Sequence, residues 1–265
     1  TSGNSNVAIG YNAGFSVTSG NYNVYIGRIS GEGASTGSHN ACVGYGTGQY
    51  LGASTGNVLF GSYAGAYLNN TTGAANYNCF IGYQCASSSN INGDYNIGIG
   101  YSSFSQLTTG SYNIGIGNSC LTSLITGTNN TSIGLYSGMG GDVSNSVYLG
   151  AYAGRYEGSS NKLFIDSLNR TDQSTARTNS LVYGEFNNSP SSQIFRINAK
   201  LELPYLTNNI KTNKVYYDSS TKELSYYSDN FAALTDAASV SWDCITGLNK
   251  TLTTSRSDIT LNITN

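Results

Sequence analysis

The sequence is poor in charge. Lysine, arginine, aspartate and glutamate together make up 10% of its 265 residues, whereas typical soluble domains carry about 25%. The net charge of −2 provides no electrostatic attraction toward nucleic acid or an anionic membrane surface, so we expect neither as a partner. Apolar runs are short as well, and none approaches the ~20 residues that span a bilayer. We therefore expect no membrane insertion.

Histidine and cysteine are also scarce, which bears on metal and catalytic chemistry. The chain has one histidine and five cysteines, and no two cysteines form a CxxC pair. Structural zinc sites need four such ligands at close spacing. We expect no metal, no cofactor and no catalytic residue, and we interpret the cysteines as small apolar side chains. They are Cys42, Cys79, Cys85, Cys120 and Cys244.

The few charges are unevenly distributed, which divides the chain. Residues 1–160 hold four acidic and two basic residues, and residues 161–265 hold ten of each. We predict a repeat domain over residues 1–160, a β-strand connector or neck over 161–230, and the start of a C-terminal β-domain over 231–265. Stretches such as NKLFIDSL, SLVYGEF, KVYYDSSTKELSYYS and DITLNIT indicate short strands, and no convincing helix is evident. Both ends look like cuts in a longer chain.

Glycine and tyrosine are abundant instead, with 33 and 22 copies, and the glycines recur. GDYNIGIGYS at 93–102 and GSYNIGIGNS at 110–119 are near-copies that lie seventeen residues apart. Alignment on one motif glycine gives nine copies, with steps of 17, 17, 17, 21, 18, 17, 17 and 16 residues. Such a period is the signature of a repeat architecture. The motif glycines are Gly10, Gly27, Gly44, Gly61, Gly82, Gly100, Gly117, Gly134 and Gly150.

Three further columns of the repeat are regular. The residues one and three before the motif glycine are apolar, except Thr131, and share one face of a short strand because they lie two apart. The residue three after the glycine is always small. Asparagine stands four before it in eight copies, where it suits a left-handed turn or a ladder of stacked amides. These asparagines are Asn6, Asn23, Asn40, Asn57, Asn78, Asn96, Asn113 and Asn130.

The period limits the architecture. Helical repeats need about 33 residues, whereas seventeen suit two strands of about five residues and two tight turns. We predict an all-β protein: a β-solenoid or β-roll of about nine coils, in which each strand pairs with its equivalents above and below. The motif glycine then lies at a coil corner, or where two backbones approach too closely for a Cβ. We expect packing between chains to supplement the burial within each coil.

The coils are similar to those of known fibrous proteins. NSNVAIGYNAG and NYNVYIG resemble the head repeats of trimeric autotransporter adhesins, which form a trimeric left-handed parallel β-roll. YSSFSQLTTGSYNIGIG is closer still to arrays in viral and bacterial fibre proteins, and NKVYYDSSTKELSYYS resembles a neck of phage and large-virus fibres. The resemblance implies a homotrimer, and it implies that the closing segment begins a phage-fibre β-domain.

Three functions remain open at this stage. The first is a structural fibre protein of a virion, a tail or capsid fibre, that forms a stiff trimeric rod at the virion surface and attaches to a host receptor. The second is a bacterial cell-surface trimeric adhesin, which is also extracellular. The third is a polysaccharide-degrading tailspike, which needs paired carboxylates about 5–10 Å apart. We expect no enzyme, because the acids of the repeats occupy unrelated positions in different coils: Glu32, Asp94, Asp142 and Glu157.

Four tyrosines are the candidate contacts with a receptor. Tyr11, Tyr45, Tyr83 and Tyr101 directly follow a motif glycine. If these rings are exposed, their apolar bodies and polar tips suit contact with a glycan. If they pack in the core or between chains, their role is structural. The sequence leaves both interpretations open.

Overall fold

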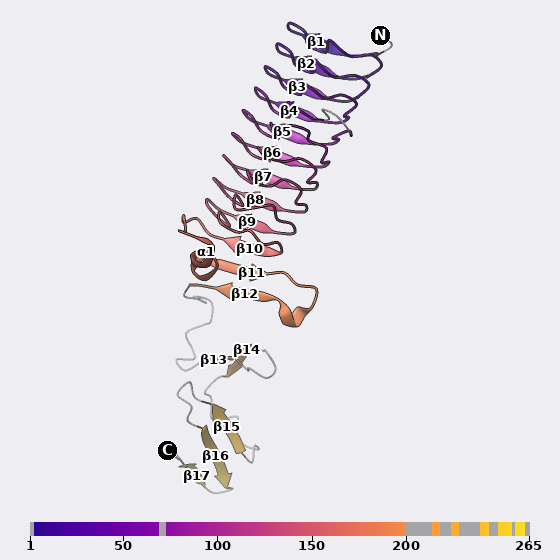
Figure 1. Cartoon of the computed structure of the whole chain (residues 1–265). Helices are drawn as coiled ribbons and strands as arrows, with labels where there is room; N and C mark the ends of the chain where they lie inside the picture. The colour runs from indigo at the N-terminus through magenta and orange to yellow at the C-terminus, as the bar shows by residue number, and fades with distance from the viewer. Residues whose placement is uncertain are drawn as a thin grey trace, which may run out of the picture. The chain divides into compact units, whose positions relative to one another are not determined.

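The computed structural model describes residues 3–68 and 73–199, together with the backbone of five strands between residues 214 and 262. The chain divides into two compact units, Thr1–Leu201 and Glu202–Asn265. The first unit is a β-solenoid of nine coils, which follow one another along the rod in chain order (Figure 1). The predicted fold class and repeat period are therefore confirmed.

Each coil contributes one three-residue strand to a single sheet. Neighbouring strands are parallel, and residues at the same position of the repeat face each other, as Val7 and Val24 do. The same register continues through the whole array. The strands are β1 (Val7–Ile9), β2 (Val24–Ile26), β3 (Ala41–Val43), β4 (Val58–Phe60), β5 (Cys79–Ile81), β6 (Ile97–Ile99), β7 (Ile114–Ile116), β8 (Thr131–Ile133) and β9 (Val147–Leu149).

The prediction of two five-residue strands per coil is wrong, because turns replace the second strand. In all nine coils the residues two and four after the motif glycine have positive φ, as Asn12 (55°) and Gly14 (59°) show. Left-handed residues at alternate positions curl the chain out of an extended path. The turns still join adjacent coils, since the Gly14 N–H donates to the Ser30 carbonyl oxygen at 2.9 Å.

The motif glycine meets both requirements inferred from the sequence. At Gly100 φ is +135°, which side chains disfavour, and a Cβ there would lie 2.4 Å from the carbonyl oxygen of Gly117 in the next coil. The other motif glycines have φ between +109° and +142°. The coils stack this closely because the glycine column carries no side chains.

The core lies on the inner face of the strands. From β2 to β9 the middle residue of each strand is buried, as Tyr25, Leu59 and Phe80 are, whereas Ala8 of the terminal strand β1 is exposed. In β6 and β7 that residue is glycine, and the buried ring of Phe104 lies where the missing side chains would be. This explains the first glycine of each IGIG sequence, Gly98 and Gly115. The small residues three after the motif glycine complete the core: all but Ala13 are buried.

The asparagines form a continuous ladder. The side-chain oxygen of Asn78 accepts from the backbone N–H of Asn96 at 2.8 Å and from its side-chain amide at 3.1 Å. The Asn96 amide also donates to the Gly110 carbonyl oxygen at 2.9 Å. The same contacts recur from Asn6 to Asn130. The left-handed interpretation of this column is wrong, because the residue before each asparagine has the positive φ instead.

A second polar ladder, which was not predicted from the sequence, lies two positions before the asparagine column. At every step except that from Ser111 to Thr128, the side chain of a small polar residue accepts the backbone N–H of its equivalent in the preceding coil. This ladder therefore runs opposite to the asparagine ladder. Asp94 accepts from the Asn76 N–H, and Ser111 accepts from the Asp94 N–H at 3.0 Å. The uniform polarity of this column is the signal that would have revealed it. Its members are Asn4, Asn21, Ser38, Thr55, Asn76, Asp94, Ser111, Thr128, Ser144 and Ser160.

The sheet continues past the boundary predicted at residue 160. β10 (Lys162–Ile165) pairs in parallel with β9, and the antiparallel strands β11 (Val182–Glu185) and β12 (Ile194–Ile197) follow. A seven-residue helix, α1 (Gln173–Asn179), joins β10 to β11, and a 3-10 turn covers Pro190–Ser192. We call residues 161–199 the cap, because the direction of strand pairing changes here.

The sequence did not reveal α1, since only one of its side chains, Ala176, is buried. A capping box fixes its start: the Asp172 carboxylate accepts from the Thr175 N–H at 2.8 Å. Glu157 ties the helix to the last coil, with its carboxylate 2.7 Å from Arg177 Nη2. The Glu157 side chain is fully buried and also accepts from Gln173 at 2.7 Å.

The second unit contains the strands expected from its sequence. β13 (Lys214–Tyr217) and β14 (Leu224–Tyr227) form an antiparallel pair. β15 (Ser239–Asp243), β16 (Asn249–Ser255) and β17 (Asp258–Asn262) form an antiparallel sheet in chain order. Cys244 lies outside the described residues.

Candidate interaction surface

The outer face of the solenoid sheet is apolar. The residues one and three before each motif glycine point outward, whereas the middle residue points inward. Ile9 is 59% exposed, Phe60 56% and Ile133 42%. The two apolar columns therefore share one face as predicted, but that face is not the core. We call this surface the apolar strip: both columns of β1 to β9, with Leu163 and Ile165 of β10.

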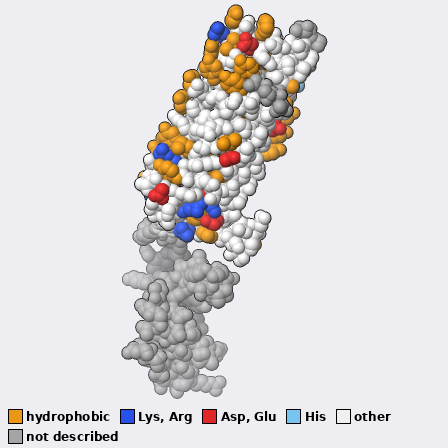
Figure 2. All heavy atoms as spheres, viewed as in Figure 1, with side chains coloured by type: hydrophobic (Ala, Val, Ile, Leu, Met, Phe, Trp, Pro, Cys, Tyr) orange, Lys and Arg blue, Asp and Glu red, His pale blue; other side chains and the backbone are white. Residues whose placement is uncertain are grey.

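The apolar strip carries no charged side chain along its length. The face of the molecule in Figure 2 likewise has few charged groups along the coils, and more of them near the cap. Soluble monomers rarely expose a contiguous apolar patch of more than a few hundred Å². A strip of this kind across ten strands is therefore the candidate interaction surface of the solenoid.

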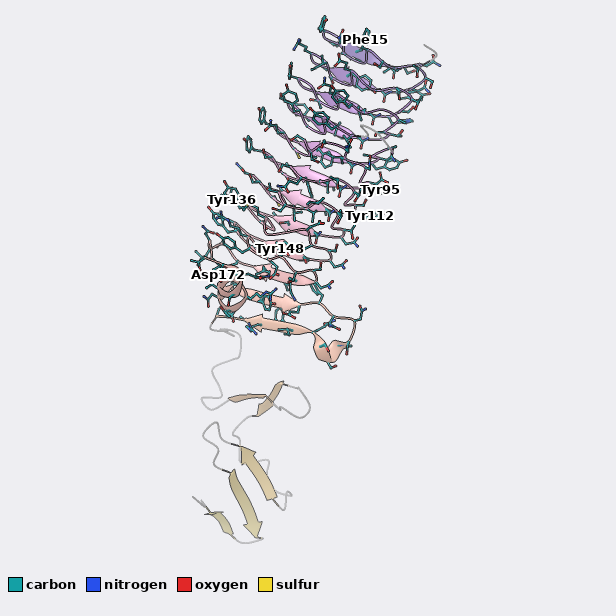
Figure 3. The ribbon with its side chains drawn as sticks, in the orientation of Figure 1. Phe15, Tyr95, Tyr112, Tyr136, Tyr148 and Asp172 are labelled. Atoms are coloured by element: carbon teal, nitrogen blue, oxygen red, sulfur yellow. The ribbon has the colours of Figure 1, made fainter. Side chains whose placement is uncertain are left out.

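Stacked tyrosines flank the strip on both edges. Figure 3 shows Tyr95 and Tyr112 at the edge where strands begin and Tyr136 at the opposite edge. The Tyr95 ring lies 5.2 Å from that of Tyr77 and 5.1 Å from that of Tyr112, with nearly parallel planes. Tyr136 stacks on Tyr152 at 5.8 Å. The rings stack because equivalent residues of neighbouring coils are separated by the distance between paired strands, about 4.7–4.9 Å.

The four candidate tyrosines all lie on the surface of the isolated chain, beside the apolar strip. Tyr11 is 68% exposed, and Tyr45 is 38% exposed. Tyr83 and Tyr101 stack on each other with centroids 5.7 Å apart and planes at 8°. Each ring thus covers one face of the other, so a ligand beside this pair meets ring edges and hydroxyl groups.

Arg28 stands in the same column, between Tyr11 and Tyr45. Its guanidinium carbon lies 5.7 Å and 5.6 Å from the two ring centroids, within the range of a cation–π contact. Its Nη1 donates to the Tyr45 hydroxyl at 3.1 Å. Arg28 was not predicted as a contact residue from the sequence, although it is the one basic residue before Arg155.

The four acidic side chains of the repeats each have their own hydrogen-bond partners. Glu32 accepts from the Asn12 and Gln49 amides at 3.0 and 2.9 Å. Asp142 accepts from three consecutive backbone N–H groups at 125–127, and these bonds, with one from Thr126, outweigh its desolvation and lower its pKa. Glu157 binds Arg177, and Asp94 belongs to the second ladder. The structure brings no two of these carboxylates into one hydrogen-bonded group.

Three of the cysteines lie in the core. Cys42, Cys85 and Cys120 are buried and free, and burial raises the pKa of the last two thiols to about 12. Cys79 differs, because it belongs to the apolar strip and is only partly buried. Desolvation raises its pKa as well.

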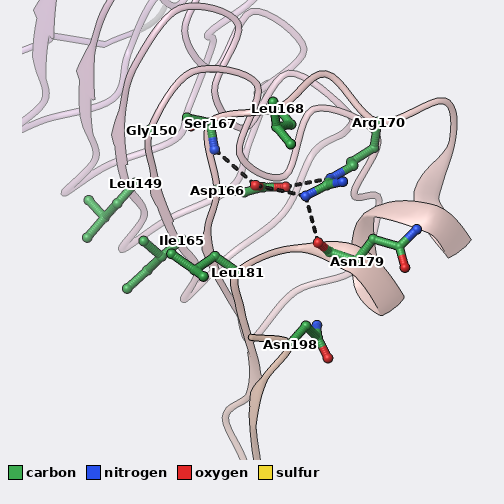
Figure 4. A pocket seen from close by; sticks show the side chains of 10 residues that line it. All are labelled: Leu149, Gly150, Ile165, Asp166, Ser167, Leu168, Arg170, Asn179, Leu181 and Asn198. Carbon is green, nitrogen blue, oxygen red and sulfur yellow. Dashed lines mark hydrogen bonds and ion pairs between the residues drawn. The ribbon is translucent and has the colours of Figure 1, made fainter. Parts of the chain in front are cut away.

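One cavity of about 440 Å³ lies where the solenoid meets the cap (Figure 4). Leu149 and Ile165 of the apolar strip line it, with Leu168. Its charged groups are paired: the Asp166 carboxylate is 2.7 Å from Arg170 Nε. The cavity continues the apolar strip and is therefore part of the same surface.

Comparisons with protein-family models, curated proteins and solved structures give no significant match. Within residues 3–68 and 73–199, and in the described strands beyond them, no three histidine, cysteine or acidic side chains are grouped to hold a metal ion. The described part of the chain has no helix of the length and apolarity that would cross a membrane.

Proposed function

We propose that this chain is a structural fibre protein that assembles into a stiff trimeric rod. The observation that carries the proposal is the uncharged apolar strip, which runs across β1 to β10 on the outside of a closed coil. Burying exposed apolar surface contributes about 25 cal/mol per Å² to the free energy of association. Every coil adds apolar side chains to the strip, so contact between chains along the strip would bury such surface at every coil. Three copies is the number that the resemblance to fibre and adhesin repeats implies.

The proposed biological role is that of a virion tail or capsid fibre that attaches to a host surface. The regular coil supports a role in extension, because every turn is joined to the next by backbone bonds and two polar ladders. The exposed tyrosines beside the strip support a role in attachment. A bacterial surface adhesin with the same architecture is the alternative, and the source of the chain separates the two.

A charge placed on the apolar strip tests the assembly. In Ile133→Glu a carboxylate would be buried between copies without a partner, which is strongly unfavourable. We expect sedimentation velocity to show three chains for the parent protein and a shift toward one chain for the variant. Gln106→Glu is the matched control, because it adds the same charge at an exposed site away from the strip.

Two results would contradict the proposal. One is a parent protein that sediments as a single chain at every concentration. The other is an assembly that tolerates Ile133→Glu as well as Gln106→Glu, which would place the contacts elsewhere. Circular dichroism of both variants shows whether the coil itself is intact.

A further inference from the structure

Arg28 is held in one position by its neighbours. It is the only lysine or arginine before Arg155. The rings of Tyr11 and Tyr45 lie on either side of its guanidinium group, and the Tyr45 hydroxyl accepts from Nη1. These contacts restrict the side chain, so a ligand that binds it loses less conformational entropy.

No carboxylate neutralises this charge. None of the three ion pairs within the described residues involves Arg28. Glu32, the nearest acid in the sequence, is instead engaged by the amides of Asn12 and Gln49. Arg28 is exposed, and of its donors only Nη1 has a hydrogen-bond partner among the described residues.

Arg155 shows what a structural arginine looks like in the same fold. Its guanidinium carbon lies 5.2 to 5.5 Å from the rings of Tyr136, Tyr152 and Tyr156. However, its Nη1 donates to Asn169 at 2.9 Å and its Nε is buried. Arg28 shares the aromatic contacts, but its side chain is exposed, and its Nε and Nη2 have no hydrogen-bond partner among the described residues.

We propose that Arg28 binds the oxyanion, a carboxylate or a sulfate, of an acidic saccharide. The planar guanidinium fork matches such groups with two parallel hydrogen bonds. The Tyr11 and Tyr45 rings beside it suit contact with a sugar ring, and the Glu32 carboxylate of the same coil is already engaged by the Asn12 and Gln49 amides. A polyanion such as nucleic acid would need several cations in a row, and this region has one. The inference rests on the proposed role in attachment and names the ligand class for it.

The test measures binding of oligosaccharides of equal length to the assembled protein by calorimetry. Keratan sulfate fragments carry sulfates without carboxylates, hyaluronan fragments carry carboxylates, and dextran fragments carry neither. We expect the parent protein to bind at least one acidic oligosaccharide and not dextran. Arg28→Gln should weaken that binding roughly 10- to 100-fold, the range for a charged hydrogen-bonded contact. Arg28→Lys should restore only part of it, because lysine lacks the fork.

The matched control is Arg196→Gln, which removes one positive charge from the exposed cap. Arg196 lies over Tyr183 and donates to the backbone carbonyl oxygen of Arg177. It belongs to β12 in the cap, whereas Arg28 lies in the second coil. Binding by this variant should stay within about twofold of the parent, which excludes a general effect of net charge.

Three outcomes overturn the inference while the proposed fibre stands: equal binding by Arg28→Gln, equal binding of dextran, or equal binding of polyglutamate, which would indicate an acidic peptide. Loss of the trimer in Arg28→Gln also overturns it, since Arg28 would then be an interface residue. Failure of the parent protein to bind any cell surface or glycan, although trimeric, contradicts the attachment role itself.

Discussion

At the scale of single residues, the fold depends on columns in which each position has one physical task. The motif glycine permits close stacking, the asparagine links coils through its amide, and the middle strand residue fills the interior. The sequence predicted the glycine and asparagine columns, because few other residues fit those positions. It did not reveal the core column, which runs Ala8, Tyr25, Cys42, Leu59, Phe80, Gly98, Gly115, Ser132, Tyr148. Residues so different in size show no common pattern.

Gly100→Ala tests the stacking requirement. The new Cβ would lie 2.4 Å from the Gly117 carbonyl oxygen, at a φ of +135° that alanine disfavours. We expect a loss of about 3 kcal/mol in the free energy of unfolding, measured with urea. Gly158→Ala is the control, because nothing lies within 4 Å of its Cβ position and it should change stability little. Equal stability of the two variants would contradict the account.

At the scale of elements, the strand, the turns and the cap differ in how much the sequence could predict. The two-residue spacing of the apolar columns placed them on one face of the strand, but a periodicity does not say which face is outside. The second strand was predicted from the length of the coil, and the left-handed residues that replace it include non-glycine residues such as Ile29 and Leu121. The short helix α1 depends on one capping box and one ion pair, which leave almost no periodic signal.

The ion pair between Glu157 and α1 makes the cap sensitive to acid. Burial acts to raise the pKa of Glu157, but hydrogen bonds from Arg177, Gln173 and the Ser159 N–H outweigh it and lower the pKa below its usual value. A carboxyl whose pKa is lower in the folded state contributes stability above its unfolded pKa, near 4.3. That contribution disappears as the pH falls through the folded pKa.

Glu157→Gln tests this coupling. At pH 7 we expect it to lower the unfolding free energy of the cap by roughly 2–3 kcal/mol, because it leaves the partly exposed Arg177 without its charge partner. As the pH falls below about 4.3 the difference between the variant and the parent should shrink, and it should vanish below the folded pKa of Glu157. Hydrogen exchange of the α1 and β11 amides across this pH range measures both. A constant difference between the two proteins from pH 3 to pH 7 would contradict the assignment.

At the scale of the whole molecule, the closed coil fills its own core but leaves the apolar strip uncovered. The need for packing between chains was inferred from the sequence, whereas its location was not, because the strip was taken as part of the coil's own burial. The candidate tyrosines lie beside the strip, so they border any interface formed there. The repeat residues do not indicate the source of the chain or its receptor, because the stacking of the coils accounts for the repeat columns.

Cys79 reports on whether the strip is covered. With Cys244→Ser in the background, it is the one thiol outside the core among the described cysteines. We expect N-ethylmaleimide to label Cys79 slowly in the assembled protein and much faster in the Ile133→Glu variant. Cys42, Cys85 and Cys120 should stay unlabelled in both, because burial raises their pKa values. Fast labelling of Cys79 in the assembled parent would show that the strip is open.

The most direct test of the central claim is the native mass of residues 1–265, measured by light scattering over a dilution series. The apolar strip predicts that the chains associate, and the resemblance to trimeric fibre repeats predicts a mass of three times the 27.9 kDa of one chain, stable on dilution. A folded protein with the mass of a single chain at every concentration would contradict it. The strip would then be a solvent-exposed face of a self-sufficient solenoid.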